Sequence, residues 1–170
     1  MGEPLAPLSG ARILELLPQQ EPFRFVDEIL EVDDDHIVAK YTFRPDADFY
    51  RGHFPGNPIT PGVLLVEAMA QTGVVALGIY LVARERSVEE VRRVLTVFTD
   101  VSAEFSGVVR PGDTVTISAR KVFFRRMKLR ADVEMRLADG SLVATATVAG
   151  MGIEAASPAK AEASESGGRP

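Results

Sequence analysis

One long apolar segment, Val63 to Ala83, constrains the fold of this chain more than any other feature of its sequence. About 20 such residues are enough for a helix to cross a bilayer. However, Glu67 and Gln71 lie inside the segment, and a carboxylate is costly in lipid. A helix that is apolar on every side is equally typical of the centre of a soluble domain. We therefore predict a buried central helix and no membrane span.

The rest of the chain is rich in predicted strands. Two runs before the helix, Phe23 to Val32 and His36 to Phe43, flank a turn of three aspartates and indicate a hairpin. A short helix is predicted over Gly10 to Leu17. The strands predicted after the apolar segment are Val91–Asp100, Ser102–Val109, Asp113–Phe124, Lys128–Ala138 and Leu142–Ile153. One apolar helix among so many strands indicates the α+β class, with an antiparallel sheet wrapped around one long central helix.

The length of 170 residues suits a single domain. We assign the folded unit to residues 9–153 and a flexible N-terminus to residues 1–8. Residues 154–170 are rich in Ala, Ser, Glu, Gly and Pro and contain no aromatic residue. Such a segment buries too little apolar surface to offset its ordering entropy, so we predict a disordered C-terminal tail.

Composition argues against several classes of function. The net charge of −5 is unsuited to electrostatic binding of nucleic acid. The absence of cysteine excludes disulfides, thiol catalysis and cysteine-ligated metal sites. Residues 1–8 lack the basic and apolar pattern of a secretory signal, so we expect a cytoplasmic protein.

A rigid loop carries one of the two histidines. His53 lies in RGHFPGNPITPGV, residues 51–63, which holds three prolines and three glycines and leads directly into the apolar helix. Proline fixes φ and glycine permits backbone shapes denied to other residues, so such a loop can hold one conformation. The other histidine, His36, follows three aspartates at a turn and is interpreted as a solvated strand residue.

Glu67 lies about one and a half turns into the predicted helix, roughly 8 Å along its axis. Its neighbours are aliphatic, so desolvation is expected to raise its pKa and favour the neutral acid. Gln71 is one turn further along the same face, within reach of the Glu67 carboxyl group. At the start of the helix, the N–H groups of Gly62 and Val63 lack helical partners and could bind a carbonyl oxygen or an oxyanion.

His53 and Glu67 together have the properties of an acid–base pair. A histidine near its usual pKa can serve as base, and a carboxyl held protonated can serve as acid. Such a pair suits proton abstraction beside a carbonyl with loss of a β-leaving group. The alternative is a core-facing histidine and a glutamate satisfied by structural hydrogen bonds, and spacing and burial alone weigh the two equally.

The run GHFPGNPITPGVLLVEAMAQ, residues 52–71, resembles the signature of the bacterial 3-hydroxyacyl-(acyl-carrier-protein) dehydratases of type II fatty acid synthesis. The flanking elements that agree with this family are Leu17-Pro18, Pro22-Phe23, Val26-Asp27 and Arg110-Pro111-Gly112-Asp113. The similarity spans residues 16–152, nearly the whole folded region. It favours a functional His53–Glu67 pair over a structural one.

The resemblance implies a hotdog fold and a homodimer whose sheets join edge to edge, and trimers of such dimers are common in the family. It implies that His53 of one subunit faces Glu67 of the other. His53 would take the C2 proton, Glu67 would protonate the departing C3 hydroxyl, and the Gly62 N–H would bind the thioester oxygen. The product would be a trans-2-enoyl thioester, formed without metal or redox cofactor. Val63 is assigned with Gly62 to oxyanion or substrate binding, and the supporting site residues would be Gln71, Phe54, Pro61 and Thr60.

Four positions bear on the substrate. Relatives that both dehydrate and isomerise ten-carbon chains tend to have Asp where this chain has Glu67, so the resemblance favours simple dehydration. Thr60 stands where the family pattern has Met, and Gln19-Gln20 stand where it has His-Arg. These departures leave open the acyl chain and the pathway, fatty acid or polyketide.

An acidic acyl carrier protein would need a local basic patch on this acidic chain. One candidate docking group surrounds a predicted hairpin and consists of Arg120, Lys121, Arg125, Arg126, Lys128 and Arg130, with Phe123 and Phe124 between them. A second group after the helix consists of Arg84, Arg86, Arg92 and Arg93. For either group, the alternative is a set of ordinary solvated charges.

Two other functions compete with dehydration. A hotdog acyl thioesterase would hydrolyse the thioester with carboxylate-activated water, but it needs no histidine in this loop. A non-catalytic subunit of a heterodimeric dehydratase would need neither catalytic residue, whereas both His53 and Glu67 are present.

Overall fold

The computed structural model describes residues 7–155. Most of the predicted N-terminal extension, residues 1–8, and most of the predicted tail, residues 154–170, lie outside the described residues. The folded unit reaches one residue beyond the predicted boundary, because the last strand ends at Glu154.

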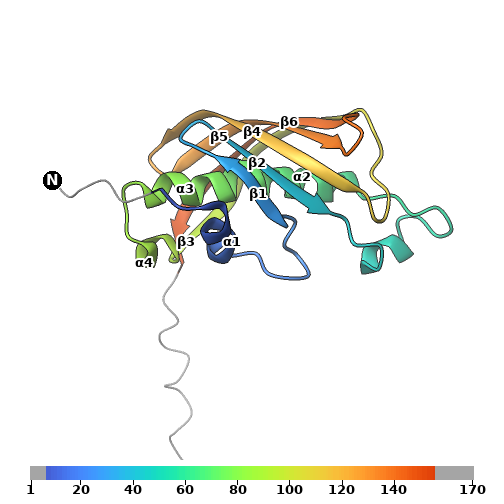
Figure 1. The fold of residues 1–170 in the computed structure, drawn as a ribbon, viewed down its shortest axis with the longest axis horizontal. Coiled ribbons are helices and arrows are strands. Elements are labelled where there is room, and N and C mark those ends of the chain that lie inside the picture. Colours follow the sequence, from blue (N-terminus) through green and yellow to red (C-terminus); the bar gives the residue numbers. More distant parts are fainter. Residues whose placement is uncertain (1–6, 156–170) are drawn as a thin grey trace, which may run out of the picture.

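Six antiparallel strands form one sheet in the order β1-β2-β4-β5-β6-β3. The strands are β1 (Glu28–Val32), β2 (His36–Thr42), β3 (Val94–Phe105), β4 (Thr114–Arg125), β5 (Lys128–Leu137) and β6 (Leu142–Glu154). After β2 the chain passes through the central helix to the opposite edge of the sheet, where β3 pairs with β6. This crossover places the helix against the sheet between its two edges (Figure 1).

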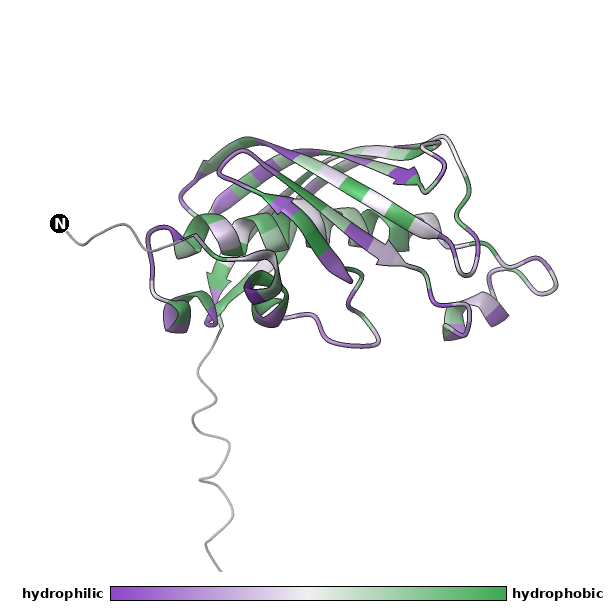
Figure 2. Cartoon of the chain, in the orientation of Figure 1, coloured by the Kyte–Doolittle hydropathy of each residue, from purple (hydrophilic) through white to green (hydrophobic). Residues whose placement is uncertain are grey.

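The central helix lies in the curve of the sheet (Figure 1). It runs through Gly62–Ala83 as α2 (Gly62–Ala70), the π-helical segment η2 (Gln71–Ala76) and α3 (Leu77–Ala83). Figure 2 shows the helix mainly in hydrophobic colours and the loops and strand ends mainly in hydrophilic ones. The helix is long and apolar enough for a membrane span, yet 67% of its most apolar window is buried inside the fold. It is the core helix that the sequence predicts.

Gly73 lets this helix approach the sheet closely. A Cβ atom at that position would lie 2.9 Å from Val133 Cγ2 on β5 and 3.1 Å from Ala119 Cβ on β4. Because contacts this short require neighbouring atoms to shift, the missing side chain sets the helix–sheet distance.

Three short helical segments complete the described fold. The predicted N-terminal helix is α1 (Gly10–Leu16), and its cap is Ser9, whose Oγ accepts from the Arg12 N–H at 3.3 Å. A 3-10 turn, η1 (Asp48–Arg51), precedes the loop of His53. The fourth α-helix, α4 (Val88–Val91), begins with a capping box between Ser87 and Glu90.

The predicted α+β architecture, the hotdog fold, is confirmed, but two strand assignments are wrong. The run Phe23 to Val32 is a strand only from Glu28, because the backbone of Phe23 and Phe25 bonds to a helix side chain instead of a neighbouring strand. The two runs predicted over Val91–Asp100 and Ser102–Val109 form one strand, β3 (Val94–Phe105). Its pairing with β6 is irregular between Phe98 and Asp100, so the ladder shifts register without ending the strand.

Candidate active site

The loop after η1 holds His53 in a defined orientation. The His53 N–H donates to the Phe49 carbonyl at 3.0 Å, and the His53 carbonyl accepts from the Ile59 N–H at 2.9 Å. His53 Nδ1 lies 2.8 Å from the Ile59 carbonyl oxygen. Because a carbonyl can only accept, Nδ1 carries the proton and the Nε2 of a neutral ring keeps its lone pair. This is the state that a general base requires.

Thr60 and Phe54, predicted as supporting residues, both contact the elements that hold His53. Thr60 is buried; its N–H donates to the Val109 carbonyl at 2.9 Å, and its Oγ1 lies 2.5 Å from the Tyr50 hydroxyl. Burial raises the pKa of Tyr50 above its usual value, so the phenol stays a neutral hydrogen-bonding group. The Phe54 ring stacks on the His53 ring, with centroids 4.2 Å apart.

The Glu67 carboxyl group is held by Gln71, one turn further along the helix. Gln71 Nε2 donates to Glu67 Oε1 at 2.8 Å and to the Phe23 carbonyl at 2.8 Å, while Gln71 Oε1 accepts from the Phe25 N–H at 2.7 Å. The Phe25 N–H can only donate, so it fixes which end of the amide faces Glu67. Gln71 is fully buried, and Glu67 Oε1 is thereby committed as an acceptor.

The start of α2 offers two unpaired donors. The first helical bonds are donated by Leu64 and Leu65 to the Pro61 carbonyl, at 2.9 and 3.3 Å. The preceding N–H groups belong to Gly62 and Val63, and the N-cap Pro61 makes no side-chain cap. These donors, at the positive end of a helix that continues to Ala83, can attract a carbonyl oxygen or an anion.

A cavity of about 140 Å³ opens beside Glu67. Its lining residues are Gln19, Glu67, Ala70, Val74, Val75, Thr96, Phe98 and Gly150. His53 is not among them, so one copy of the chain brings Glu67 but not its own His53 to this cavity. The wall formed by Thr96 and Phe98 belongs to β3, the edge strand.

The predicted docking group is divided by the fold. Arg125, Arg126 and Lys128 gather with Phe123 and Met151 around a surface hollow of about 460 Å³ at the β4–β5 turn. Of the others, Lys121 lies 3.1 Å from an Asp35 carboxylate oxygen, Arg130 lies 2.9 Å from Asp100, and Arg120 faces the outer surface of the sheet.

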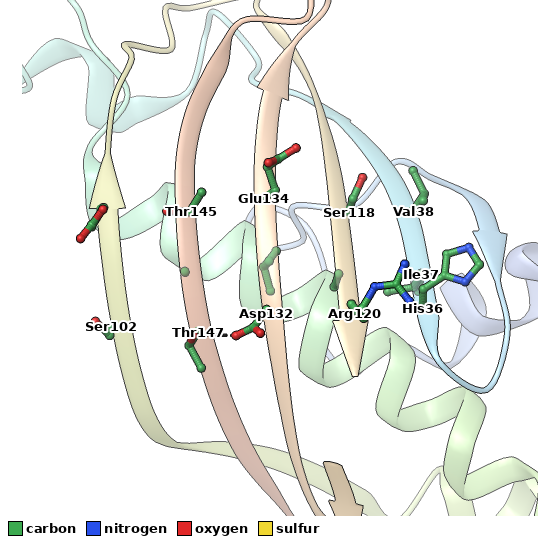
Figure 3. A pocket seen from close by; sticks show the side chains of 14 residues that line it. His36, Ile37, Val38, Ser102, Ser118, Arg120, Asp132, Glu134, Thr145 and Thr147 are labelled. Atoms are coloured by element: carbon green, nitrogen blue, oxygen red, sulfur yellow. Dashed lines mark hydrogen bonds between the residues drawn. The ribbon is translucent and has the colours of Figure 1, made fainter. Parts of the chain in front are cut away.

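The outer hollow that includes Arg120 is large, about 750 Å³, but lies away from the site residues. Figure 3 shows hydroxyl and charged side chains from neighbouring strands projecting into it, with Thr147 Oγ1 donating to Asp132 at 2.7 Å. Neither His53 nor Glu67 lines this hollow, and His36 lies at its margin. The His36 side chain is 33% exposed, and its Nδ1 atom lies 2.8 Å from Asp33.

Several residues that shape the site were not predicted. Tyr50 and Ile59 support the histidine loop, and Phe23 and Phe25 orient Gln71. Each of these residues acts through a backbone group or through a contact with a residue far away in the sequence. Contacts of either kind leave no local pattern in the sequence. Gly150 lines the cavity from β6, where the sequence shows only a glycine within a strand.

Comparisons with known proteins agree on a family. The FabA-like domain family matches residues 17–149. The chain is 39% identical over 139 residues to the 3-hydroxyacyl-(acyl-carrier-protein) dehydratase FabZ of Acetivibrio thermocellus, covering 81% of this chain and 89% of that protein. It is 38% identical over 138 residues to the FabZ of Streptococcus uberis, covering 80% and 91%.

Two solved structures share the fold at low identity. A thioesterase from Haemophilus influenzae superposes with a TM-score of 0.63 and 18% identity, over 89% of this chain and 94% of that one. The dehydratase heterocomplex ApeI:P from Xenorhabdus doucetiae gives a TM-score of 0.64 and 15% identity, over 84% and 91%. These likenesses establish the hotdog fold alone, whereas the sequence matches establish the relationship: the chain belongs to the FabA-like family, among the 3-hydroxyacyl-(acyl-carrier-protein) dehydratases.

Proposed function

We propose that this chain removes water from a 3-hydroxyacyl thioester carried on acyl carrier protein and releases a trans-2-enoyl thioester. The observation that carries the proposal is the held pair of groups, His53 with Nδ1 tied to Ile59 and Glu67 with Oε1 tied to Gln71. The names of its FabZ relatives support the same reaction. We place it in the cytoplasm, in fatty acid or related polyketide synthesis.

The proposed chemistry uses the atoms of His53 and Glu67 that the orienting hydrogen bonds leave available, Nε2 and Oε2. His53 Nε2 takes a proton from C2 while the Gly62 N–H binds the thioester oxygen, which stabilises the charge that develops there. Glu67 gives the proton of its carboxyl group to the C3 hydroxyl, the C3–O bond breaks, and water leaves as the C2–C3 double bond forms. The Gln71 hydrogen bond occupies Oε1, so the transferred proton resides on Oε2.

A complete site requires a second copy of the chain. The edge strand β3 exposes large apolar side chains: Leu95, Val97, Phe98, Val101 and Phe105 are 39 to 51% exposed. An apolar edge with unpaired backbone groups is suited to join another strand. Pairing of two β3 edges would bring His53 of one copy towards the cavity beside Glu67 of the other. Such dimers could assemble further into a trimer of dimers. Light scattering would distinguish that hexamer from a single dimer by its mass.

The carrier protein docks at the hollow formed by Arg125, Arg126 and Lys128. These cations surround the exposed apolar side chains Phe123 and Met151, a combination suited to an acidic protein surface. Lys121 and Arg130 already lie beside carboxylates, so they are weaker candidates.

Turnover of 3-hydroxyacyl carrier-protein substrates tests the proposal. The wild type should form enoyl product, followed by mass spectrometry, and His53→Ala and Glu67→Gln should each lose at least about a hundredfold. Release of free thiol without enoyl product would identify a thioesterase. A folded chain that forms enoyl product only after a partner protein is added would identify a subunit of a heteromeric enzyme.

A further inference from the structure

The helix presents its polar groups in the order of the atoms of the proposed substrate. The free N–H group of Gly62 stands at its start and Glu67 follows about one and a half turns later. With the thioester oxygen at Gly62 and the C3 hydroxyl at Glu67, carbons from C4 onward continue along the same helix. The next cavity residues in that direction are Ala70, Val74 and Val75, all buried and apolar.

The space available for those carbons is small. The cavity beside Glu67 measures about 140 Å³. About 10–15 Å³ of such space is enough for one water-sized group, so this cavity accommodates the first carbons of an acyl tail beyond C3.

A second cavity continues beyond the first, but side chains nearly fill it. It measures about 20 Å³, against about 140 Å³ for the first cavity, which leaves room for about one water-sized group. Val74, Val75, Thr96 and Gly150 line both cavities, so these residues form the neck between them. Phe124 and Met127, from the β4–β5 hairpin, belong to the wall of the inner cavity.

The neck is tightly packed between Val74 on the helix and Gly150 on β6. A Cβ atom at Gly150 would lie 2.6 Å from Val74 Cγ1 and 2.8 Å from Thr96 Cγ2. Val74 is 3% exposed, so its methyl groups have little room to move aside. An acyl chain longer than the first cavity would have to displace Val74.

We propose that this enzyme is selective for short acyl chains and that the Val74–Gly150 neck sets the limit on their length. The inference rests on the proposed dehydratase function. Val74 and Gly150 act as specificity residues: they touch the acyl tail and take no part in the proton transfers.

Competition among 3-hydroxyacyl carrier-protein substrates of four to sixteen carbons tests the limit. The wild type should show a kcat/KM for the twelve-carbon substrate at least about tenfold below that for the six-carbon substrate, a discrimination that misfit in an apolar pocket can supply. Val74→Ala joins the two cavities and should raise the ratio of twelve- to six-carbon kcat/KM about fivefold or more. Val74→Ile narrows the neck and should lower the ratio of eight- to four-carbon kcat/KM.

Val115→Ala is the matched control. Val115 is a fully buried core valine on β4 that lines neither cavity. It loses the same two methyl groups and should leave the length profile unchanged, while thermal unfolding confirms that each variant is folded. A wild type that dehydrates all lengths equally, or prefers sixteen carbons, overturns the length limit and leaves the dehydratase function intact. Absence of enoyl product at every length overturns the function itself.

Discussion

The hydroxyl groups of Tyr50 and Thr60 lie 2.5 Å apart inside the fold, next to the carbonyl that orients the catalytic candidate His53. Thr60 follows Ile59 directly, and its N–H is fixed to Val109 at 2.9 Å. The Tyr50–Thr60 hydrogen bond therefore anchors the backbone at Ile59. The carbonyl of Ile59 accepts the hydrogen bond that His53 Nδ1–H donates.

Removing the Thr60 hydroxyl should loosen the His53 loop. Thr60→Val keeps the side-chain shape and should cost about 1 kcal/mol of unfolding free energy, the usual net value of a hydrogen bond. It should also lower kcat more than it raises KM, because a less fixed His53 acts mainly on the chemical step. Thr60→Ser keeps the hydroxyl and should restore kcat. Equal kcat in Thr60→Val and the wild type would show that the anchor does not position His53.

Tyr50 makes stability depend on pH in the alkaline range. Burial raises the folded-state pKa of its phenol above its usual value. A raised pKa means that the folded state holds the proton more tightly, so this contribution to stability is fully present below about pH 10 and is lost as pH rises through the folded pKa. Urea unfolding between pH 8 and 11 should show a steeper alkaline loss for the wild type than for Tyr50→Phe. Parallel curves would contradict this.

Gln71 should prove essential for both stability and rate. Gln71→Leu leaves the buried N–H of Phe25 and the carbonyl of Phe23 without partners, which should cost about 1–3 kcal/mol of unfolding free energy. It also frees the Glu67 carboxyl group, so kcat should fall by about tenfold or more. Gln20→Leu is the control, because that glutamine is exposed in the loop after α1 and its side-chain amide donates to the Leu17 carbonyl at 3.0 Å. Similar rates in the two variants would exclude a positioning role.

Charge reversal at the β4–β5 turn should separate docking from chemistry. Arg125→Glu with Arg126→Glu should reduce kcat/KM for a carrier-protein substrate about tenfold at low salt, and less at high salt, because exposed charges are screened. Turnover of a small thioester mimic should remain unchanged. Arg92→Glu with Arg93→Glu tests the second basic group in the same assay. A greater loss in that pair would move the docking surface to the end of the central helix.

The sequence predicts the elements whose signals are local. The apolar run after Pro61 predicts the helix, and the spacing of Glu67 and Gln71 by one turn predicts their contact. The motif around His53 predicts the family. In contrast, the segment from Phe23 shows the same alternation as a strand, yet its backbone bonds to Gln71, a residue 46 to 48 positions away. Such long-range pairings, like the closeness of Gly150 to Val74, arise only from tertiary packing and leave no periodic trace.

A mixed dimer tests the central claim most directly. Chains carrying His53→Ala and chains carrying Glu67→Gln are coexpressed with different tags, and the dimer with one of each is isolated. If each site takes His53 from one copy and Glu67 from the other, one of its two sites is intact, so it should form enoyl product at about half the wild-type rate although both parent dimers are inactive. A mixed dimer as inactive as its parents, beside an active wild type, would contradict the shared dehydratase site.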